Sequence, residues 1–480
     1  MATGTKICTM IPRRLLAARS LSTVSFFAEK YPVAEAATPP LALDLSDTQR
    51  LFASFPTSTL FRSLATLSVM AAGPLVDLGT ATIRAMESSD RRILRAAVFE
   101  VARTTVHRHF CAGEGLEDAS RTVQRMWDTT GMRSILDYAM EDADDNVACD
   151  RNIAGFLRAI ELASSLPPTS ASVCVKITAL CPISLLERIS DLLRWQQKNP
   201  TFRLPWRTSS FPILSNSSPL YLTPHPPVPL TETEELDLQL ALQRLSSICK
   251  RCEESNIPLL IDAEYLTVQP AIDYFTYFAA LQFNRGDQPI VYGTFQTYLR
   301  DSEQRMANAF QAAEEAGVSL GVKLVRGAYL TRETKLALSL DVPSPIHGSI
   351  HETHECFNSC ASFMLEKVKK GHGAVVLATH NLESGRIAAE KAEELRIGKH
   401  DRKLQFAQLM GMADGLSLGL RNAGFYVSKY LPFGPVEQVL PYLLRRAEEN
   451  RGFVSTSSID RQLLRKELLR RLATIVVGRT

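Results

Sequence analysis

Residues 258–329 decide the fold, because three short apolar runs alternate there with helix-like stretches. The runs are PLLIDAEY (258–265), IVYGTFQTYL (290–299) and GVKLVRGAY (321–329), and a segment such as SEQRMANAFQAAEEAG (302–317) has the spacing of a helix. Strands that alternate with helices indicate βαβ units in a parallel sheet. Further runs lie at 134–140, 173–180, 374–381, 406–412 and 425–433, which makes eight. Eight units predict an α/β protein with a distorted, TIM-like (β/α)8 barrel, and an open doubly wound sheet is the alternative.

The composition is that of a folded chain with no bias toward nucleic acid. The 480 residues are 45% hydrophobic and 22% charged, so the chain is long enough to bury a sizeable core. The net charge is +3 and no basic block has aromatic residues interleaved, which argues against a nucleic-acid partner. Nine cysteines, an odd number in so long a chain, argue against a disulfide framework and favour a reducing compartment.

The first 28 residues differ from the rest of the chain in charge. They contain Lys6, Arg13, Arg14 and Arg19 and no acidic residue. A basic, hydroxyl-bearing leader without a compact apolar core is typical of a mitochondrial transit peptide, and a disordered terminus is the plain alternative. We therefore predict a transit peptide at 1–28 and a mitochondrial location.

The remaining chain divides by composition. We predict a linker and N-terminal helical arm at 29–130, a catalytic barrel at 131–455 with a proline-rich insertion at 200–235, and a basic amphipathic helix at 456–480. The segment 63–83 has the length of a membrane span, but Gly73, Pro74 and Asp77 interrupt it, so a packed helical arm is expected. The C-terminal helix is expected to pack on the barrel; peripheral contact with an anionic membrane, and a non-enzymatic membrane adaptor, are the alternatives.

Polar residues recur late in several of the expected strands. Lys176, Asp262, Gln296, Lys323 and His380 all occupy such positions, and Tyr430 lies near the end of the eighth run. Sites in (β/α)8 barrels are built at the carboxyl ends of the strands, so these side chains are expected to face one mouth. Interior ion pairs with a purely structural role, such as Lys176 with Asp262, are the alternative.

The segment PVEQVLPYLLRRAEENRG (435–452) carries a second set of polar residues. Tyr442, Arg445, Arg446 and Glu449 fall at i, i+3, i+4 and i+7, which is one face of a helix. Guanidinium forks bind carboxylates, and a tyrosine ring covers apolar groups, so this face suits a small molecule with a carboxylate. A solvated charged face paired through Glu449 is the alternative. Pro441 is expected to kink the helix or to mark its start.

Five motifs together resemble the proline dehydrogenase family, in its mitochondrial form. They are VKITAL, IDAEY, GVKLVRGAY, ATHN and YLPFGPVEQVLPYLLRRAEEN, and the likeness spans about residues 134–455. The resemblance implies oxidation of L-proline to Δ1-pyrroline-5-carboxylate, with hydride transfer to N5 of FAD and electrons passed to ubiquinone or another respiratory acceptor. It also implies a matrix location with contact to the inner mitochondrial membrane. A hydroxyproline dehydrogenase of the same family is the nearest alternative.

The resemblance also implies roles for individual residues. Arg445 and Arg446 would bind the proline carboxylate with help from Lys176, while Tyr430, Tyr442 and Leu409 would enclose the ring. Asp262 would order the substrate-binding face, and Glu449 would brace the arginines. Bacterial members often carry arginine where Lys323 stands. The residues expected to line the FAD are Gln296, Lys323, Val325, Gly327, Ala328, Thr379, His380 and Asn381.

Two other patterns offer competing chemistry. His347, His351, His354, Cys356 and Cys360 form a His/Cys cluster that would suit a metal-dependent barrel hydrolase, but the spacing is not that of HExxH. Cys249 and Cys252 form a lone CxxC near a helix end, where structural cysteines are the usual case. We expect no catalytic metal. A Rossmann or P-loop nucleotide site lacks its glycine motif here, which does not exclude FAD bound to a barrel.

Overall fold

The structure is a computed structural model that describes residues 43–72, 77, 79, 81–82, 92–208, 210–452 and 454–477. All of these belong to one compact unit, residues 42–480. The predicted transit peptide at 1–28 lies outside the described residues. The side chains of residues 446–457 are likewise outside the description.

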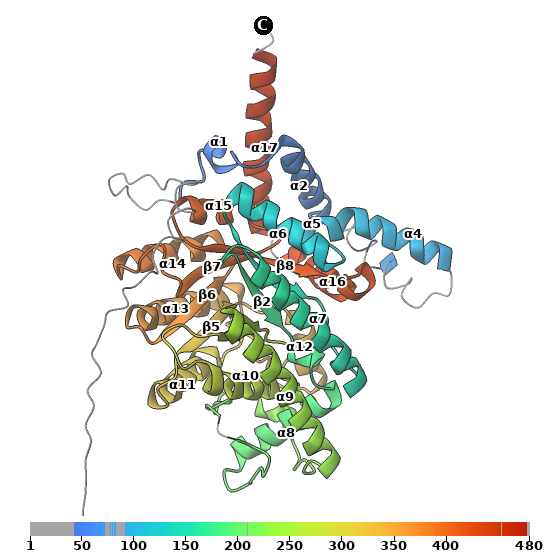
Figure 1. The fold of residues 1–480 in the computed structure, drawn as a ribbon, viewed down its shortest axis with the longest axis vertical. Helices are drawn as coiled ribbons and strands as arrows, with labels where there is room; N and C mark the ends of the chain where they lie inside the picture. Colours follow the sequence, from blue (N-terminus) through green and yellow to red (C-terminus); the bar gives the residue numbers. More distant parts are fainter. Residues whose placement is uncertain are drawn as a thin grey trace, which may run out of the picture. The chain divides into compact units, whose positions relative to one another are not determined.

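Eight parallel strands close into a barrel in the order of the chain (Figure 1). The predicted (β/α)8 fold is therefore confirmed, and the open doubly wound sheet is wrong. Each of the eight apolar runs overlaps one strand. The strands are β1 (Arg133–Tyr138), β2 (Ala171–Val175), β3 (Leu259–Ile261), β4 (Val291–Gln296), β5 (Leu320–Val325), β6 (Gly373–Ala378), β7 (Leu404–Leu409) and β8 (Val427–Phe433).

The barrel closes where β8 pairs with β1, and the register there aligns Ile135 with Tyr430. Alternate residues of each strand face the interior, so the same side of every strand fills the barrel. Ile135, Cys174, Leu260 and Tyr292 belong to one buried core cluster with Tyr430. Because the barrel interior is a packed core rather than a pore, only its two ends are available for binding sites.

Helices surround the barrel and begin at residues that cap them. Thr231 forms a capping box with Glu234, and Asp145, Ser349 and Asn381 accept backbone N–H bonds at other starts. These helices are α7 (Asn146–Ser165), α8 (Ile183–Lys198), α9 (Glu232–Ser255), α10 (Gln269–Phe283), α11 (Ser302–Glu315), α12 (Leu330–Ser339), α13 (Ile350–Lys369), α14 (Leu382–Glu394), α15 (Asp414–Asn422) and α16 (Val436–Gly452), with short 3-10 turns at Ile177–Ala179 and Leu220–Leu222. Helix α16 begins before Pro441, so this proline does not mark its start.

An N-terminal helical arm is attached to the loops that follow β7 and β8. Its described elements are α1 (Thr48–Leu51), α2 (Thr57–Met70), α4 (Arg92–Ala102), a π-helical turn (Arg103–His107), α5 (Arg108–Phe110) and α6 (Leu116–Thr130). His107 Nε2 lies 3.2 Å from Gly434 O, after β8, and His109 Nε2 lies 2.9 Å from Gly411 O, after β7. The arm therefore holds two loops at the carboxyl end of the barrel.

The C-terminal helix α17 (Val454–Val477) lies beside α1 and α2 (Figure 1). Glu467 is fully buried and pairs with Arg470 and Arg471 on the same helix. Arg471 also donates to the carbonyls of Phe52 and Phe55 at 2.8 Å each, which ties α17 to the segment between α1 and α2. Within the described residues no helix is long and apolar enough to span a bilayer.

The proline-rich segment 200–235 packs against α10 and α11. Ser218 donates to Asp301 at 2.5 Å, and Arg305 donates to the carbonyl of Ile213 at 3.2 Å. Arg305 is buried and is also paired with Asp273 at 2.5 Å. Buried charges need such partners, so this cluster fixes the segment against the helices around the barrel. Leu222 of the same segment packs against Leu266, Tyr298 and Ile346, in loops that follow strands of the barrel.

Candidate active site

A cavity opens at the carboxyl ends of the barrel strands. It holds about 1160 Å³ of empty space, counted out to its open mouth. All but two of the site residues expected from the sequence line it: Lys176, Asp262, Gln296, Lys323, Val325, Gly327, Ala328, Thr379, His380, Asn381, Leu409, Tyr430, Tyr442 and Arg445. The other two, Arg446 and Glu449, lie in α16, but their side chains are outside the described residues.

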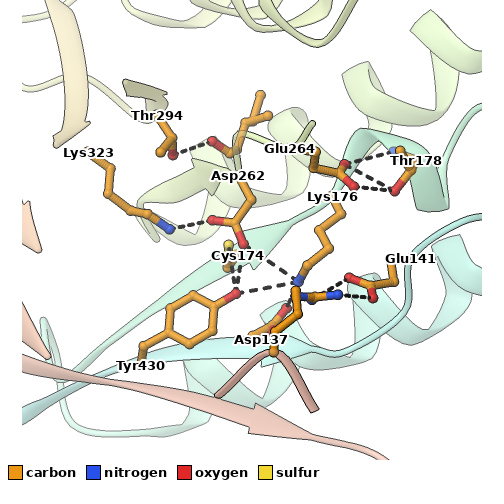
Figure 2. A network of polar contacts seen from close by, with 12 residues as sticks. Asp137, Glu141, Cys174, Lys176, Thr178, Asp262, Glu264, Thr294, Lys323 and Tyr430 are labelled. Atoms are coloured by element: carbon orange, nitrogen blue, oxygen red, sulfur yellow. Dashed lines mark hydrogen bonds and ion pairs between the residues drawn. The ribbon is translucent and has the colours of Figure 1, made fainter. Parts of the chain in front are cut away.

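Two lysines, two carboxylates and a tyrosine form a charge network in the cavity wall (Figure 2). Lys176 Nζ donates to Asp137 Oδ1 at 3.0 Å and lies 3.6 Å from Asp262 Oδ2. Lys323 Nζ pairs with the other oxygen of Asp262, and Tyr430 donates its hydroxyl to Asp262 Oδ2 at 2.8 Å. The interior ion pair of Lys176 with Asp262, which was the structural alternative to a role in the site, is thus present. Lys176 nevertheless also lines the cavity.

The network fixes the protonation states of its members. Burial raises the pKa of Asp262, but the charges of Lys323 and Lys176 outweigh burial and hold that pKa below its usual range. Burial lowers the pKa of Lys176, but Asp137 and Asp262 outweigh it and raise that pKa. Both groups therefore stay charged near neutral pH. The equal numbers of lysines and carboxylates offset part of the cost of burying them.

Arg445 projects from α16 into the cavity and is held by a carboxylate that the sequence analysis missed. Its Nη1 and Nη2 donate to the two carboxylate oxygens of Glu141 at 2.8 and 2.9 Å. The guanidinium also lies 5.6 Å from the ring centre of Tyr329. A bidentate pair of this kind orients the guanidinium and keeps it in the cavity rather than in solvent. Glu141 directly follows the run 134–140, and that position was its only signal.

A second arginine in the cavity, Arg326, was also missed. It is 9% exposed, and its guanidinium donates to three neutral groups: His354 Nδ1 at 3.0 Å, Thr379 Oγ1 at 2.6 Å and Ser384 Oγ at 2.7 Å. Among the described residues no carboxylate pairs with it, and burial lowers its pKa to about 10. A charged, buried guanidinium without a counter-ion is suited to an anionic ligand.

Polar groups around Arg326 and Lys323 are held in fixed orientations. His380 Nε2 accepts the amide of Leu409 at 3.1 Å, so its neutral ring carries the proton on Nδ1. Gln296 donates to the carbonyl of Glu264 at 2.8 Å. Gly327 has φ +141°, and a Cβ there would collide with the ring of Tyr298. The structure therefore explains this glycine by its backbone conformation and by Tyr298, and not only by close approach of a ligand.

The sequence model of the family described as "Proline dehydrogenase" matches residues 119–458, which is most of the chain. The chain belongs to the proline dehydrogenase family. It is therefore an oxidoreductase, and the metal-dependent hydrolase considered from the His/Cys cluster is wrong.

Named members of the proline dehydrogenase family resemble the chain along nearly its whole length. Proline dehydrogenase 2, mitochondrial, from Arabidopsis thaliana is 52% identical over 90% of this chain and 92% of its own length. Proline dehydrogenase 1, mitochondrial, from the same organism is 53% identical over 90% and 87% of the two chains. Hydroxyproline dehydrogenase from Homo sapiens is 31% identical over 87% and 91%.

Solved structures support the fold. Proline utilization A (PutA) from Bdellovibrio bacteriovorus superposes with a TM-score of 0.63 at 17% identity, covering 85% of this chain and 41% of that chain. The chain thus spans less than half the length of this protein. At such low identity the likeness concerns the barrel and not its chemistry.

The His/Cys cluster has a different place in this member of the proline dehydrogenase family. His354 accepts the hydrogen bond from Arg326, and burial with Arg326 lowers its pKa to about 4, so it stays neutral. Among the described residues, Cys356 and Cys360 approach one carboxylate, Glu303, with ligand atoms within 4.8 Å, and no histidine joins them. Cys249 and Cys252 are buried free thiols of α9. These cysteines do not line the cavity.

Glu264 is a buried carboxyl of this barrel behind the cavity wall. It accepts hydrogen bonds from Thr178 Oγ1 at 2.9 and 3.0 Å, and burial together with Glu141 raises its pKa to about 8. The carboxyl is therefore protonated at neutral pH in the folded chain. Glu264 lies two residues beyond Asp262, whose pKa is lowered. The sequence alone does not indicate that the pKa values of these two acids shift in opposite directions.

Replacement of Glu264 by Gln is expected to stabilise the folded chain at neutral pH. Below pH 4.5 the Glu264 carboxyl is protonated in both the folded and the unfolded chain. Between pH 4.5 and about 8 it is ionised in the unfolded chain but still protonated in the folded chain. Stability contributed by the wild-type group therefore falls as the pH rises through this window, by about 1.4 kcal/mol per unit. Urea unfolding should show a gain of about 3 kcal/mol for Glu264→Gln at pH 7 and little gain at pH 4.5.

Exposed Glu355 on α13 provides the control for this experiment. Glu355→Gln should leave the free energy of unfolding nearly unchanged at both pH values, as surface substitutions usually do. An equal response of the two variants to pH would contradict the buried, protonated state of Glu264.

Proposed function

We propose that the chain is an FAD-dependent L-proline dehydrogenase that forms Δ1-pyrroline-5-carboxylate and passes its electrons to a quinone. One observation carries the proposal: a single cavity is lined by an oriented arginine, Arg445, by the tyrosines Tyr430 and Tyr442, and by the cations Lys323 and Arg326. A small cyclic amino acid needs a carboxylate anchor and an apolar cover. A flavin dinucleotide needs cations for its diphosphate and a polar edge for its ring.

The residues present fit FAD at two points. Arg326 is a buried cation whose neighbours are neutral, which suits a diphosphate, and it lies beside the N-terminus of α14, where Asn381 caps the helix. Lys323 and Gln296 supply donors from β5 and β4, and Val325, Gly327, Ala328, Thr379 and His380 complete that side of the cavity. When bound, FAD would supply a hydride acceptor for the carbon next to the substrate nitrogen.

Arg445 would bind the substrate carboxylate, and Glu141 would hold Arg445 ready in its absence. The bidentate pair uses both terminal nitrogens of the guanidinium, so an incoming carboxylate must share or replace Glu141. Lys176 and Arg446 are proposed to assist as cations, and Glu449 to brace the arginines. This exchange couples substrate binding to a local rearrangement at the mouth of the cavity.

The other residues would orient the ring and exclude water. Tyr430 is 8% exposed and fixed by its bond to Asp262, and Tyr442 is 7% exposed. Leu409 is held by the His380 bond to its amide and would contact the apolar ring. Oxidation requires the substrate nitrogen unprotonated and the reacting carbon held in one place; a carboxylate anchor at one end and rigid walls at the other meet the second need.

The test is turnover by the purified protein with an artificial electron acceptor, together with identification of the released flavin. We expect turnover of L-proline to exceed that of trans-4-hydroxyproline, and FAD to be released on denaturation. Equal or greater turnover of hydroxyproline would assign the chain to the hydroxyproline-oxidising members. Absence of flavin would contradict the proposal as a whole.

Replacement of Arg326 by Gln is expected to weaken FAD binding. The variant loses the charge-assisted contact that the buried Arg326 guanidinium would make with the diphosphate. Such a contact contributes about 3 kcal/mol, so the Kd for FAD should rise roughly 100-fold. Titration of apoprotein with FAD, followed by flavin fluorescence, measures this. Arg326→Lys retains the charge and should recover part of the affinity, whereas equal FAD affinity in wild type and Arg326→Gln would refute the assigned role.

We further propose that the protein works in the mitochondrial matrix at the inner membrane. The relatives from Arabidopsis thaliana are named mitochondrial, and the first 28 residues of this chain are basic and contain no acidic residue.

On α17 the side chains of Leu469 and Leu472 are 68% and 54% exposed, next to several basic residues. An apolar and basic helix surface supports peripheral contact with anionic lipid, where a quinone acceptor is available. Cosedimentation with cardiolipin-containing vesicles tests this contact, and loss of it in Leu469→Glu would support it.

A further inference from the structure

A second cavity lies at the amino ends of the strands, at the other end of the barrel. Arg133 and Ser172 line it at the starts of β1 and β2, while Lys176 lines the candidate active site just after the end of β2. Four residues of extended chain separate Ser172 from Lys176, which is about 13 Å. Leu260 and Tyr292, which belong to the barrel core, line part of this second cavity and not of the candidate active site. The two cavities are therefore distinct.

The charge of this second cavity is entirely positive. Its charged lining residues are Arg133 and Arg402, and no carboxylate lines it. Neutral groups able to form hydrogen bonds surround the arginines: Thr169, Ser172, Gln288, Gln405 and Ser428. In the described part of the chain neither arginine takes part in an ion pair closer than 4.0 Å.

Arg133 is fixed in place without a counter-ion. Its Nη2 donates to Thr169 Oγ1 at 3.3 Å, and its guanidinium lies 3.4 Å from the ring centre of Tyr426. Burial lowers the pKa of Arg133 to about 10, and the charge of Arg402 acts in the same direction. Arg133 and Arg402 line the same cavity, and like charges repel, so an anion bound between the two guanidinium groups would reduce that repulsion.

Thr169, which positions Arg133, has a strained backbone. Its φ is +66°, in the left-handed region that β-branched residues rarely adopt. Strain of this kind persists where the surrounding structure enforces it and is frequent at binding sites. The loop before β2 therefore holds its hydroxyl at the arginine against a local preference.

We propose that this cavity binds a phosphate group, either as inorganic phosphate or as the head of a phosphomonoester. The cavity holds about 690 Å³ of empty space, counted out to its open mouth as for the candidate active site, so it has room for a tetrahedral anion. Two guanidinium groups match a dianion in charge and can donate in pairs to its oxygens, and the hydroxyl and amide groups can satisfy the remaining oxygens. This site would be independent of proline oxidation and of the flavin.

Isothermal titration calorimetry of the flavin-loaded protein with inorganic phosphate, at constant ionic strength, tests the proposal. We expect saturable binding at one site that weakens at least about 10-fold in Arg402→Gln, because one of the two cations is lost. Arg402 is exposed at the rim, so this variant should fold normally. Arg285→Gln, an exposed arginine outside the cavity, is the matched control.

Two further arms complete the experiment. Arg445→Met should bind phosphate as the wild type does, which separates this site from the candidate active site. Glycerol 3-phosphate in place of inorganic phosphate shows whether a phosphomonoester is preferred, and the tighter of the two identifies the source. Absence of saturable binding to wild type, or equal affinity in wild type and Arg402→Gln, would overturn the proposal.

Discussion

Replacement of Arg445 by Met should raise the KM for L-proline by about 100-fold while the flavin stays bound. The methionine has similar reach but cannot donate to a carboxylate, and loss of a buried charge-assisted pair costs about 3 kcal/mol. In the variant Glu141 would also lose the partner that lowers its pKa, leaving an unpaired carboxylate beside the substrate site. Steady-state kinetics with an artificial acceptor measure the effect, and the visible spectrum reports the flavin.

Glu141→Gln is the informative companion variant. It removes the competitor for Arg445 and keeps the shape of the side chain, so its KM for L-proline should be equal to or lower than that of wild type. Arg445→Lys, which keeps the charge but not the fork, should fall between wild type and Arg445→Met. A KM unchanged in Arg445→Met would contradict the proposed role of Arg445 in carboxylate binding.

Asp262→Asn should have the second large effect, on stability as well as on activity. Asp262 pairs with Lys323, lies 3.6 Å from Lys176 and accepts the hydroxyl of Tyr430. Without its charge Lys323 has no remaining carboxylate among the described ion pairs, and breaking a buried pair in this way costs about 3 to 5 kcal/mol. The orientation of Tyr430 would change with it, so kcat/KM for L-proline should fall together with stability.

The pH dependence separates this charge effect from a change of packing. The folded pKa of Asp262 is below the ordinary 3.8, so its stabilisation is present above pH 3.8 and is lost as the pH falls through the lower folded value. The difference in unfolding free energy between wild type and Asp262→Asn should therefore shrink in acid. Asp287→Asn, on an exposed loop, serves as the control. A constant difference down to the most acidic pH at which the chain folds would indicate a packing effect instead.

The barrel could be predicted from the sequence because its strands are buried on both faces. Each strand, such as β2 with Val173 and Val175, is a short apolar run, and each is followed by helix-like spacing. Because there are eight such runs, the sequence favoured a closed barrel over an open sheet. The proline-rich segment 200–235 could be located but not placed, since its attachment depends on Arg305, Asp273 and Ser218, which are distant in sequence.

The candidate site could be predicted in part. Residues late in the strands share one mouth by the geometry of the barrel, so Lys176, Asp262, Lys323 and Tyr430 were found. Their partner Asp137 was not found, because its role arises only when the barrel closes and brings it to Lys176. Glu141 was missed for the same reason, and Arg326 was missed although it lies in the motif GVKLVRGAY. Likewise the opposite pKa shifts of Asp262 and Glu264 depend on which of them faces the lysines, which no spacing in the sequence decides.

The most direct test of the central claim is a half-reaction without oxygen or any other acceptor. The flavin-loaded protein is mixed with L-proline, and the visible absorption of the flavin is followed, with wild type and Arg445→Met compared at the same proline concentration. We expect stoichiometric bleaching in wild type, with one equivalent of Δ1-pyrroline-5-carboxylate formed, and the same change in Arg445→Met only at roughly 100-fold higher proline. A wild-type flavin that stays oxidised in saturating L-proline would contradict the account.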